Sequence, residues 1–390
     1  LSQLFIAATY GFVYLLGRDL IGARGAAAGT LLLAACFYFS WPTPEFNHNV
    51  AQMPIWAAIA FVLWRAAARN ALWFWLVAGL LAALGMYAKF STGVLLLCAG
   101  VWLLADRRGR ACLSTYKPWL GLGVFGAASL PLAIRLVETG YRPLLYAENA
   151  SAGGAGILHF LSTQVADYAA TLVIVLLAFP WRRSASADDL ANPEGVDEPT
   201  ALRFLLIVGL GPLLTTALIA LAHGAEDMWG APMLNLVGLL AILPLRRLLS
   251  QLVLRRIAAA ALFLAVVVPL AYAGMYLARF EQGEAHAPRP LWPQATIAER
   301  MSDIWRRATN APLRIVGGSP WLAGLVALTA PDQPTIYANF DQIASPWISD
   351  ERLAREGVLV VWEDRDGLPP AGRALVSGRT AGEEDFRWSP

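Results

Sequence analysis

Candidate chemistry in this sequence sits in short polar stretches between long apolar ones. Lys89 stands between two apolar segments, in a stretch that contains no other basic residue. A lysine ammonium group is a compact point charge that suits a phosphate. The alternative is that the side chain reaches toward lipid headgroups, as long basic side chains do at a membrane surface. The sequence leaves both interpretations open.

The stretch 41–50 is polar for its setting and contains no basic residue. Glu45, His48 and Asn49 supply a carboxylate, an imidazole and an amide. These groups could line a polar cavity at a membrane surface and contact a sugar or an acceptor. The plainer interpretation is a solvated turn with Asn49 as the N-cap of the next helix.

Two arginines flank the loop 135–156. Arg135 and Arg142 lie near Tyr141 and Tyr146. They could clamp a lipid phosphate, because a guanidinium group binds phosphate through two parallel hydrogen bonds. Simple anchoring in lipid headgroups is an equally good explanation.

The stretch 226–232 combines two carboxylates, Glu226 and Asp227, with Trp229. Adjacent acidic side chains point in different directions on most backbones, so we predict no metal site, and Trp229 is typical of an aromatic residue at a membrane interface. Asp227 and Trp229 remain candidate substrate contacts. The three cysteines lack metal-ligand spacing. No serine-histidine-aspartate set is recognisable either, so the catalytic residue is unknown at this stage.

The composition indicates what must position these residues. Of the 390 residues, 57% are apolar and 15% charged, against about 25% charged in an ordinary soluble domain. The mean hydropathy is +0.51. A soluble fold would lack the polar surface to cover such a core, so we predict an all-α polytopic membrane protein. The net charge of +2 does not indicate nucleic-acid binding, because the basic residues stand at the ends of apolar segments.

Ten apolar runs predict transmembrane helices. They are approximately 1–16, 25–40, 51–64, 71–86, 91–105, 118–134, 157–179, 202–222, 229–245 and 256–279. The segments between successive runs, called joints below, form two alternating sets. One set contains fifteen Lys or Arg residues and the other three, and the positive-inside rule puts the richer set in the cytoplasm. The poorer set, with the candidates above, then faces the periplasm. Because the chain starts at Leu1 and begins outside, we expect it to be the later part of a longer protein.

The region after the last span, 281–390, carries charge at the density of a soluble domain. We therefore divide the chain into a membrane region, 1–280, and a small periplasmic α/β domain, 281–390. Helical spacing predicts a helix around 297–305. Short apolar runs predict strands at 313–316, 335–338 and 358–362.

Local signals predict the helix ends of this domain. Ser319 is a good N-cap for one helix, and Ser349 can cap another that ends near Gly357. Gly317 and Gly318 follow a predicted strand. They favour a tight turn over a phosphate-binding loop, because the full glycine pattern of such a loop is absent.

Motifs spread over residues 1–245 carry a family resemblance. They are 14–18 with 22–24, 45–49 followed by Trp56 and 64–66, Gly79 and Gly85 before 88–90, and finally 227–232. In this order they resemble the bacterial GT-C-fold glycosyltransferases of the protein O-mannosyltransferase and aminoarabinose transferase-like superfamily (glycosyltransferase family 39-like).

The resemblance implies transfer of a sugar from a polyprenyl-phosphate donor. The acceptor would be a lipid, glycan or protein at the periplasmic face of the inner membrane, within the cell envelope. It implies that Lys89, and Arg135 or Arg142, lie near the carrier phosphate. The family's catalytic carboxylate follows its first span, so we expect the catalytic Asp to precede this chain. A divalent metal ion as cofactor stays open, and membrane lipids are expected partners.

Two other classes of protein stay open. One is a transporter or flippase for a lipid-linked or envelope glycan, and the other is a non-catalytic scaffold for envelope assembly. A transporter is favoured less, because the sequence shows no internal repeat and its polar residues gather at the outer ends of the spans.

Overall fold

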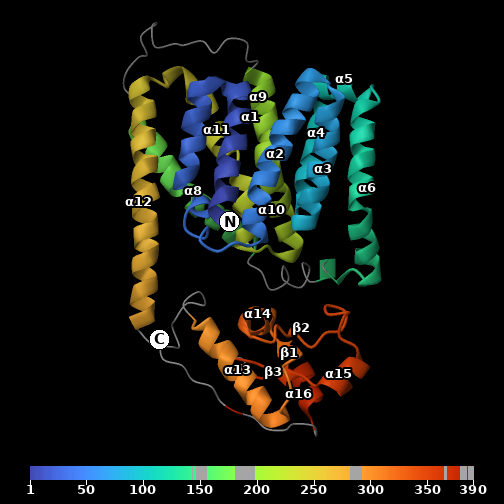
Figure 1. Ribbon diagram of the computed structural model, residues 1–390. Coiled ribbons are helices and arrows are strands. Elements are labelled where there is room, and N and C mark those ends of the chain that lie inside the picture. The colour runs from blue at the N-terminus through green and yellow to red at the C-terminus, as the bar shows by residue number, and fades with distance from the viewer. Residues whose placement is uncertain are drawn as a thin grey trace. The chain divides into compact units, whose positions relative to one another are not determined.

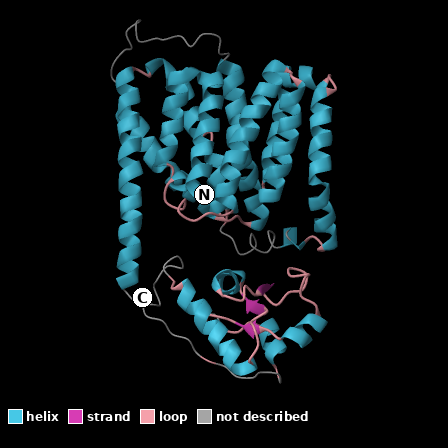
Figure 2. Cartoon of the chain, viewed as in Figure 1, coloured by secondary structure: helices cyan, strands magenta, loops and turns pink. Residues whose placement is uncertain are grey.

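The computed structural model describes residues 1–142, 144–145, 156–180, 198–281, 292–363, 367–377 and 384. The chain forms two compact units, Leu1–Tyr272 and Ala273–Pro390. The first unit is helical, and the described strands all belong to the second (Figures 1 and 2). The boundary falls inside the helix that ends the membrane region, before the boundary that we predicted at residue 280.

Helices of very different lengths make up the first unit, and the last of them continues past its boundary at Tyr272. The α-helices are α1 (Ser2–Leu31), α2 (His48–Arg69), α3 (Leu72–Ala88), α4 (Thr92–Ala105), α5 (Arg107–Leu113), α6 (Lys117–Glu138), α8 (Ile157–Ala178), α9 (Glu198–Phe204), α10 (Gly211–His223), α11 (Val237–Ile242) and α12 (Gln251–Glu281). Shorter helical turns join them: η1 (Leu32–Ala35), η2 (Phe37–Phe39), η4 (Leu205–Leu210), η5 (Asp227–Leu234) and η6 (Leu243–Leu248).

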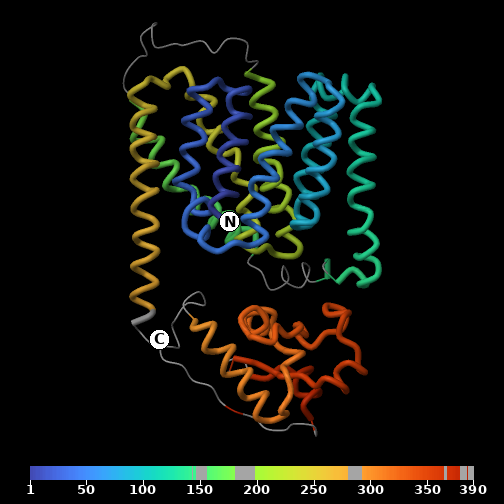
Figure 3. Tube along the Cα trace, in the orientation of Figure 1, coloured from blue at the N-terminus to red at the C-terminus, as the bar shows by residue number. Residues whose placement is uncertain are grey.

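The first helix folds back on itself at Gly22. This residue has φ 78° and ψ 167°, which interrupts the helix. A Cβ atom on Gly17 would lie 3.0 Å from the Cα atom of Ala26, whereas nine residues of straight helix would separate them by about 13 Å. The two halves of α1 are therefore packed against each other, as the trace in Figure 3 shows. The break lies within the predicted joint 17–24.

Six of the described helices are long and apolar enough to cross a membrane, or up to seven if the bent pair Asp227–Leu234 and Val237–Leu248 is one span. The predicted count of ten is therefore not confirmed. Part of the difference is length: α3 and α4 are apolar but short, and Ser2–Ala35 counts as one helix despite its break. A multi-pass membrane architecture nevertheless fits this composition, because helices satisfy their own backbone hydrogen bonds in lipid.

Side chains from joints of the basic set contact one another, and so do side chains from joints of the basic-poor set. In the basic set, Arg65 of α2 pairs with Asp19 of α1, with Nη2 and Oδ1 2.7 Å apart. Arg246 pairs with Glu198 at 2.7 Å. Residues of the other set meet one another in the same way, as the candidate site shows. The alternation of the joints is thus present in the fold, whereas the side that faces the cytoplasm stays a prediction.

Small residues allow α3 and α6 to approach closely. A side chain at Gly79 would overlap the carbonyl oxygen of Gly121, and one at Gly121 would overlap the carbonyl oxygen of Trp75. In contrast, a Cβ atom at Gly123 would meet nothing within 4 Å. Such small-residue contacts are typical of helices that pack within a membrane.

The second unit contains a three-stranded parallel sheet in the order β2-β1-β3. Its elements are α13 (Gln294–Thr309), β1 (Ile315–Gly318), α14 (Pro320–Thr329), β2 (Thr335–Ala338), α15 (Asp350–Glu356), β3 (Leu359–Val360) and α16 (Pro370–Val376). The α/β composition and the second strand agree with the prediction. The first strand begins two residues later than predicted, and the third is shorter.

The caps of this unit were predicted correctly, and its glycine pair was not. The Ser319 hydroxyl accepts a hydrogen bond from the Leu322 amide, and the Ser349 hydroxyl one from the Arg352 amide, both at 3.2 Å. Gly317 and Gly318 do not form a turn: they are the last residues of the central strand. Neighbouring side chains and backbone crowd both positions, so the strand requires residues without a Cβ atom there.

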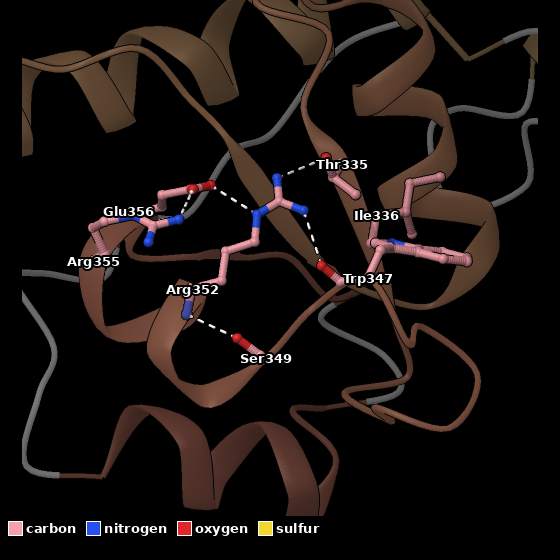
Figure 4. Close-up of polar contacts among 7 residues, drawn as sticks. All are labelled: Thr335, Ile336, Trp347, Ser349, Arg352, Arg355 and Glu356. Atoms are coloured by element: carbon pink, nitrogen blue, oxygen red, sulfur yellow. Dashed lines mark hydrogen bonds and ion pairs between the residues drawn. The ribbon is translucent and has the colours of Figure 1, made fainter.

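Arg352 connects α15 to the strand β2 (Figure 4). Its guanidinium group donates to the Thr335 hydroxyl at 3.0 Å, to the Trp347 carbonyl at 3.1 Å and to Glu356 at 2.9 Å. Trp347 in turn donates from Nε1 to the Ile336 carbonyl at 3.0 Å. This network is structural, since each of these contacts joins residues within the unit.

Candidate functional site

Three joints of the basic-poor set come together around Lys89. The Lys89 ammonium group donates to the Asn49 side-chain oxygen, with Nζ and Oδ1 2.7 Å apart. It also lies over the ring of Trp229, 5.8 Å from the ring centre. Residues 49, 89 and 229 belong to separate parts of the sequence, so the fold gathers three of the predicted candidates at one place.

Asn47, and not Asn49, is the N-cap of α2. The Asn47 side-chain oxygen accepts from the amides of Asn49 at 2.9 Å and Val50 at 3.2 Å. The interpretation of Asn49 as the cap was therefore wrong. Because Asn47 caps the helix, the buried side chain of Asn49 is available to hold the Lys89 ammonium group.

A buried polar network fixes the backbone on which Lys89 stands. Gln52 of α2 is fully buried, and its Nε2 donates to the Lys89 carbonyl at 3.3 Å and to the Thr92 hydroxyl at 2.9 Å. The Thr92 hydroxyl donates to the Gly85 carbonyl at 2.8 Å, and Trp56 donates to Thr92 at 3.1 Å. The joint between α3 and α4 is thus bound to α2, which fixes the backbone position of Lys89.

The ammonium group of Lys89 is partly withdrawn from solvent, with one carboxylate close enough to interact with it. Burial lowers the pKa of Lys89 to about 8, although the nearby carboxylate of Glu226 raises it in part. A half-buried ammonium group with an amide and an aromatic face as neighbours retains donor capacity for an anion. A phosphate oxygen is the anion that such a point charge suits.

Asp227, two residues before Trp229, is held from two sides. The Tyr38 hydroxyl donates to the Asp227 carbonyl at 2.6 Å, and Gln164 Nε2 donates to the same oxygen at 3.2 Å. Both donors are buried. Gln164 packs so closely over Gly230 that a side chain at Gly230 would overlap it. These contacts fix η5 and leave the Asp227 side chain partly exposed.

Sequence reasoning missed four residues of this region, which are Tyr38, His159, Gln164 and Asp167. His159 Nε2 lies 3.3 Å from Asp227 Oδ2, and Asp167 is close enough to Asp227 to interact electrostatically. Two of them carried a usable signal, because Gln164 and Asp167 are polar residues inside an apolar segment, where such residues are costly.

The other predicted residues lie apart from these contacts. Glu45 and His48 are exposed, although His48 is close enough to Lys89 for electrostatic interaction. Arg135 is exposed and pairs with Glu138 of its own helix at 3.4 Å. Arg142 is exposed after α6. Tyr146 lies outside the described residues. No set of three or more His, Cys, Asp or Glu side chains in the described part of the chain could hold a metal ion.

The fold defines a class: a helical protein of the multi-pass membrane type, in which Lys89, Asn49 and Trp229 meet. Residues 1–134 match the family model described as dolichyl-phosphate-mannose-protein mannosyltransferase. The match covers 134 of the 390 residues. It confirms the predicted resemblance to the GT-C-like glycosyltransferase superfamily. No curated protein and no solved structure matches the chain.

Proposed function

We propose that this chain transfers a sugar from a polyprenyl-phosphate-linked donor to an acceptor on the periplasmic face of the bacterial inner membrane. The observation that carries the proposal is the position of Lys89. Its ammonium group is held by Asn49 and faces Trp229, at a point where three joints of the bundle meet. The family match over residues 1–134, a region that includes Lys89, supports a lipid-linked donor.

The chemistry of such a transfer explains why a lysine is useful there. When the glycosidic bond breaks, negative charge develops on the phosphate oxygen that leaves. A fixed positive group near that oxygen stabilises the charge without reorganisation during the reaction. Because Gln52 and Asn49 hold Lys89 from two directions, the ammonium group is already in place before the donor binds.

The acceptor must lose a proton during the transfer, so the reaction also needs a base. Glu226 is close enough to Lys89 to interact with it electrostatically, and Asp227 stands two residues before Trp229. Arg135 and Arg142 stay proposals as additional phosphate contacts, since a guanidinium group could approach the lipid headgroup region from the end of α6. The periplasmic location of the second unit is likewise part of this proposal.

A release assay tests the function without knowledge of the sugar. Membranes of the source bacterium that lack the gene supply the natural donor and acceptor. Purified full-length protein is added to them, and mass spectrometry follows the release of free polyprenyl phosphate, the product that all such donors share. The expected result is release that depends on the added protein and falls with Lys89→Ala.

Lys117 offers the matched control, because the chain contains only these two lysines. Lys117 donates to the Asn70 carbonyl in the joint between α2 and α3, within the basic set. Lys117→Ala should therefore leave release per folded molecule unchanged. Movement of the intact donor across the membrane with no release of polyprenyl phosphate would instead identify a flippase, and neither movement nor release would favour a scaffold.

A further inference from the structure

His159 and Asp227 form a pair that faces outward from the site. His159 stands in the first turn of α8, and its Nε2 atom lies 3.3 Å from Asp227 Oδ2. The side chains are 60% and 40% exposed, respectively. A ligand can therefore reach the imidazole ring, and its Nδ1 atom is the nitrogen that does not face the carboxylate.

The pair is better fixed than an ordinary surface ion pair. An exposed ion pair contributes little free energy to stability, since two mobile side chains must be held in one geometry. Here the carboxylate partner is fixed through its own backbone, because Tyr38 and Gln164 both donate to the Asp227 carbonyl. These two donors are almost fully buried, with 1% and 3% of their surface exposed.

The pair is also close to the proposed phosphate contact. Asp227 precedes Trp229 by two residues, and two residues of chain span at most about 7 Å. The Lys89 ammonium group lies 5.8 Å from the ring centre of Trp229. One short element, η5, therefore contacts the phosphate-binding lysine with one residue and the histidine with another.

We propose that His159, oriented by Asp227, is the general base that takes the proton from the acceptor's hydroxyl group. This inference rests on the proposed function. The acceptor oxygen forms a bond to the anomeric carbon of the sugar, and the bond between that carbon and the phosphate oxygen breaks. The polyprenyl phosphate leaves with the electron pair, and the hydroxyl proton moves to Nδ1 of His159. Asp227, whose Oδ2 atom lies 3.3 Å from Nε2, stabilises the imidazolium that forms.

The arrangement assigns different tasks to the two sides of η5. Lys89 acts on the leaving group, and His159 acts on the incoming nucleophile. Asp227 is a positioning residue in this scheme.

The test uses full-length protein in the release assay with membranes that supply donor and acceptor. His159→Ala should lower the maximal release rate about a hundredfold or more, in line with the usual contribution of a general base. The affinity for polyprenyl phosphate alone, measured separately on purified protein, should stay within about twofold because Lys89 is intact. Added imidazole should restore part of the rate to His159→Ala, a rescue that a purely structural role would not give.

His223→Gln is the matched control, since His223 is an exposed histidine at the end of α10. It should change neither rate nor affinity. Asp227→Asn should lower the rate without changing the affinity for polyprenyl phosphate, because the amide cannot stabilise the imidazolium. An unchanged rate for His159→Ala, or a loss that imidazole does not restore, overturns the inference and leaves the proposed function standing. Absence of release with the unaltered protein overturns both.

Discussion

Lys89→Ala removes the ammonium group that we propose binds the carrier phosphate. A hydrogen bond to a charged group typically contributes about 1.5–3 kcal/mol, so the affinity for a polyprenyl phosphate should fall about ten- to a hundredfold. Lys89 is half-buried and held by Asn49, which reduces both screening by solvent and the entropy lost on binding. Lys89→Arg should recover part of the loss, since the charge remains although its geometry changes.

The pH dependence of binding gives a second measure of the same contact. Only the charged lysine binds the phosphate, and the pKa of Lys89 is lowered to about 8. Full affinity is therefore present below pH 8 and is lost as the pH rises through this value. For a single group with that pKa, the affinity at pH 9 should be about tenfold weaker than at pH 7. In the arginine variant this dependence should disappear, because a guanidinium group stays charged throughout the range.

Calorimetry or fluorescence titration of purified protein with a polyprenyl phosphate measures these affinities. Asn49→Asp is an informative companion, since a carboxylate placed 2.7 Å from the ammonium group would compete with the phosphate and weaken binding although the lysine remains. Anchoring in headgroups predicts a different pattern, in which the alanine variant changes insertion and leaves affinity per folded molecule intact. An alanine variant with unchanged affinity and an unchanged pH profile would refute the assignment of Lys89.

Three other predictions concern the fold and its orientation. A reporter that is active only in the periplasm should be active after the end of α12 and inactive within 181–197, and the reverse pattern would contradict the orientation. Gly121→Ala should lower the free energy of unfolding by about 1–3 kcal/mol, because the new side chain would overlap backbone atoms. Gly123→Ala should leave it unchanged, because that position faces open space. Arg352→Ala should destabilise the second unit by about 1–3 kcal/mol and speed amide exchange in β2. Arg355→Ala, which removes a side chain that is 71% exposed, should have no measurable effect.

Features that depend on neighbours in the sequence could be predicted well. Ser319 and Ser349 cap helices through amides three residues later, so the necessary information lies within one turn. The break in α1 at Gly22 falls between Arg18 and Arg24, where a polar joint was expected. Lys89 drew attention for a similar reason, because it departs from the charge bias of its side of the membrane.

Features that depend on distant contacts could not be predicted in the same way. Tyr38 and Asp227 are 189 residues apart in sequence, and no local pattern connects them. Asn49 was a candidate both for the cap and for a polar cavity, and no local pattern decides between them because its partner, Lys89, lies 40 residues away. The sheet glycines show the same limit: Gly318 is required by the approach of Val361, which the sequence around residue 318 does not reveal.

The element η5 has a consequence for how the protein is made. The Asn235 side chain just after it donates to the Met53 carbonyl at 2.7 Å, and Tyr38 and Gln164 hold its first residue. A ribosome releases these segments in chain order, so α2 and the lysine joint enter the membrane long before residues 227–235 exist. Trp229 cannot cover Lys89 until the segment that carries it has been inserted. The cluster of Lys89, Asn49 and Trp229 is therefore complete only at a late stage of biogenesis, after the bundle around it has assembled.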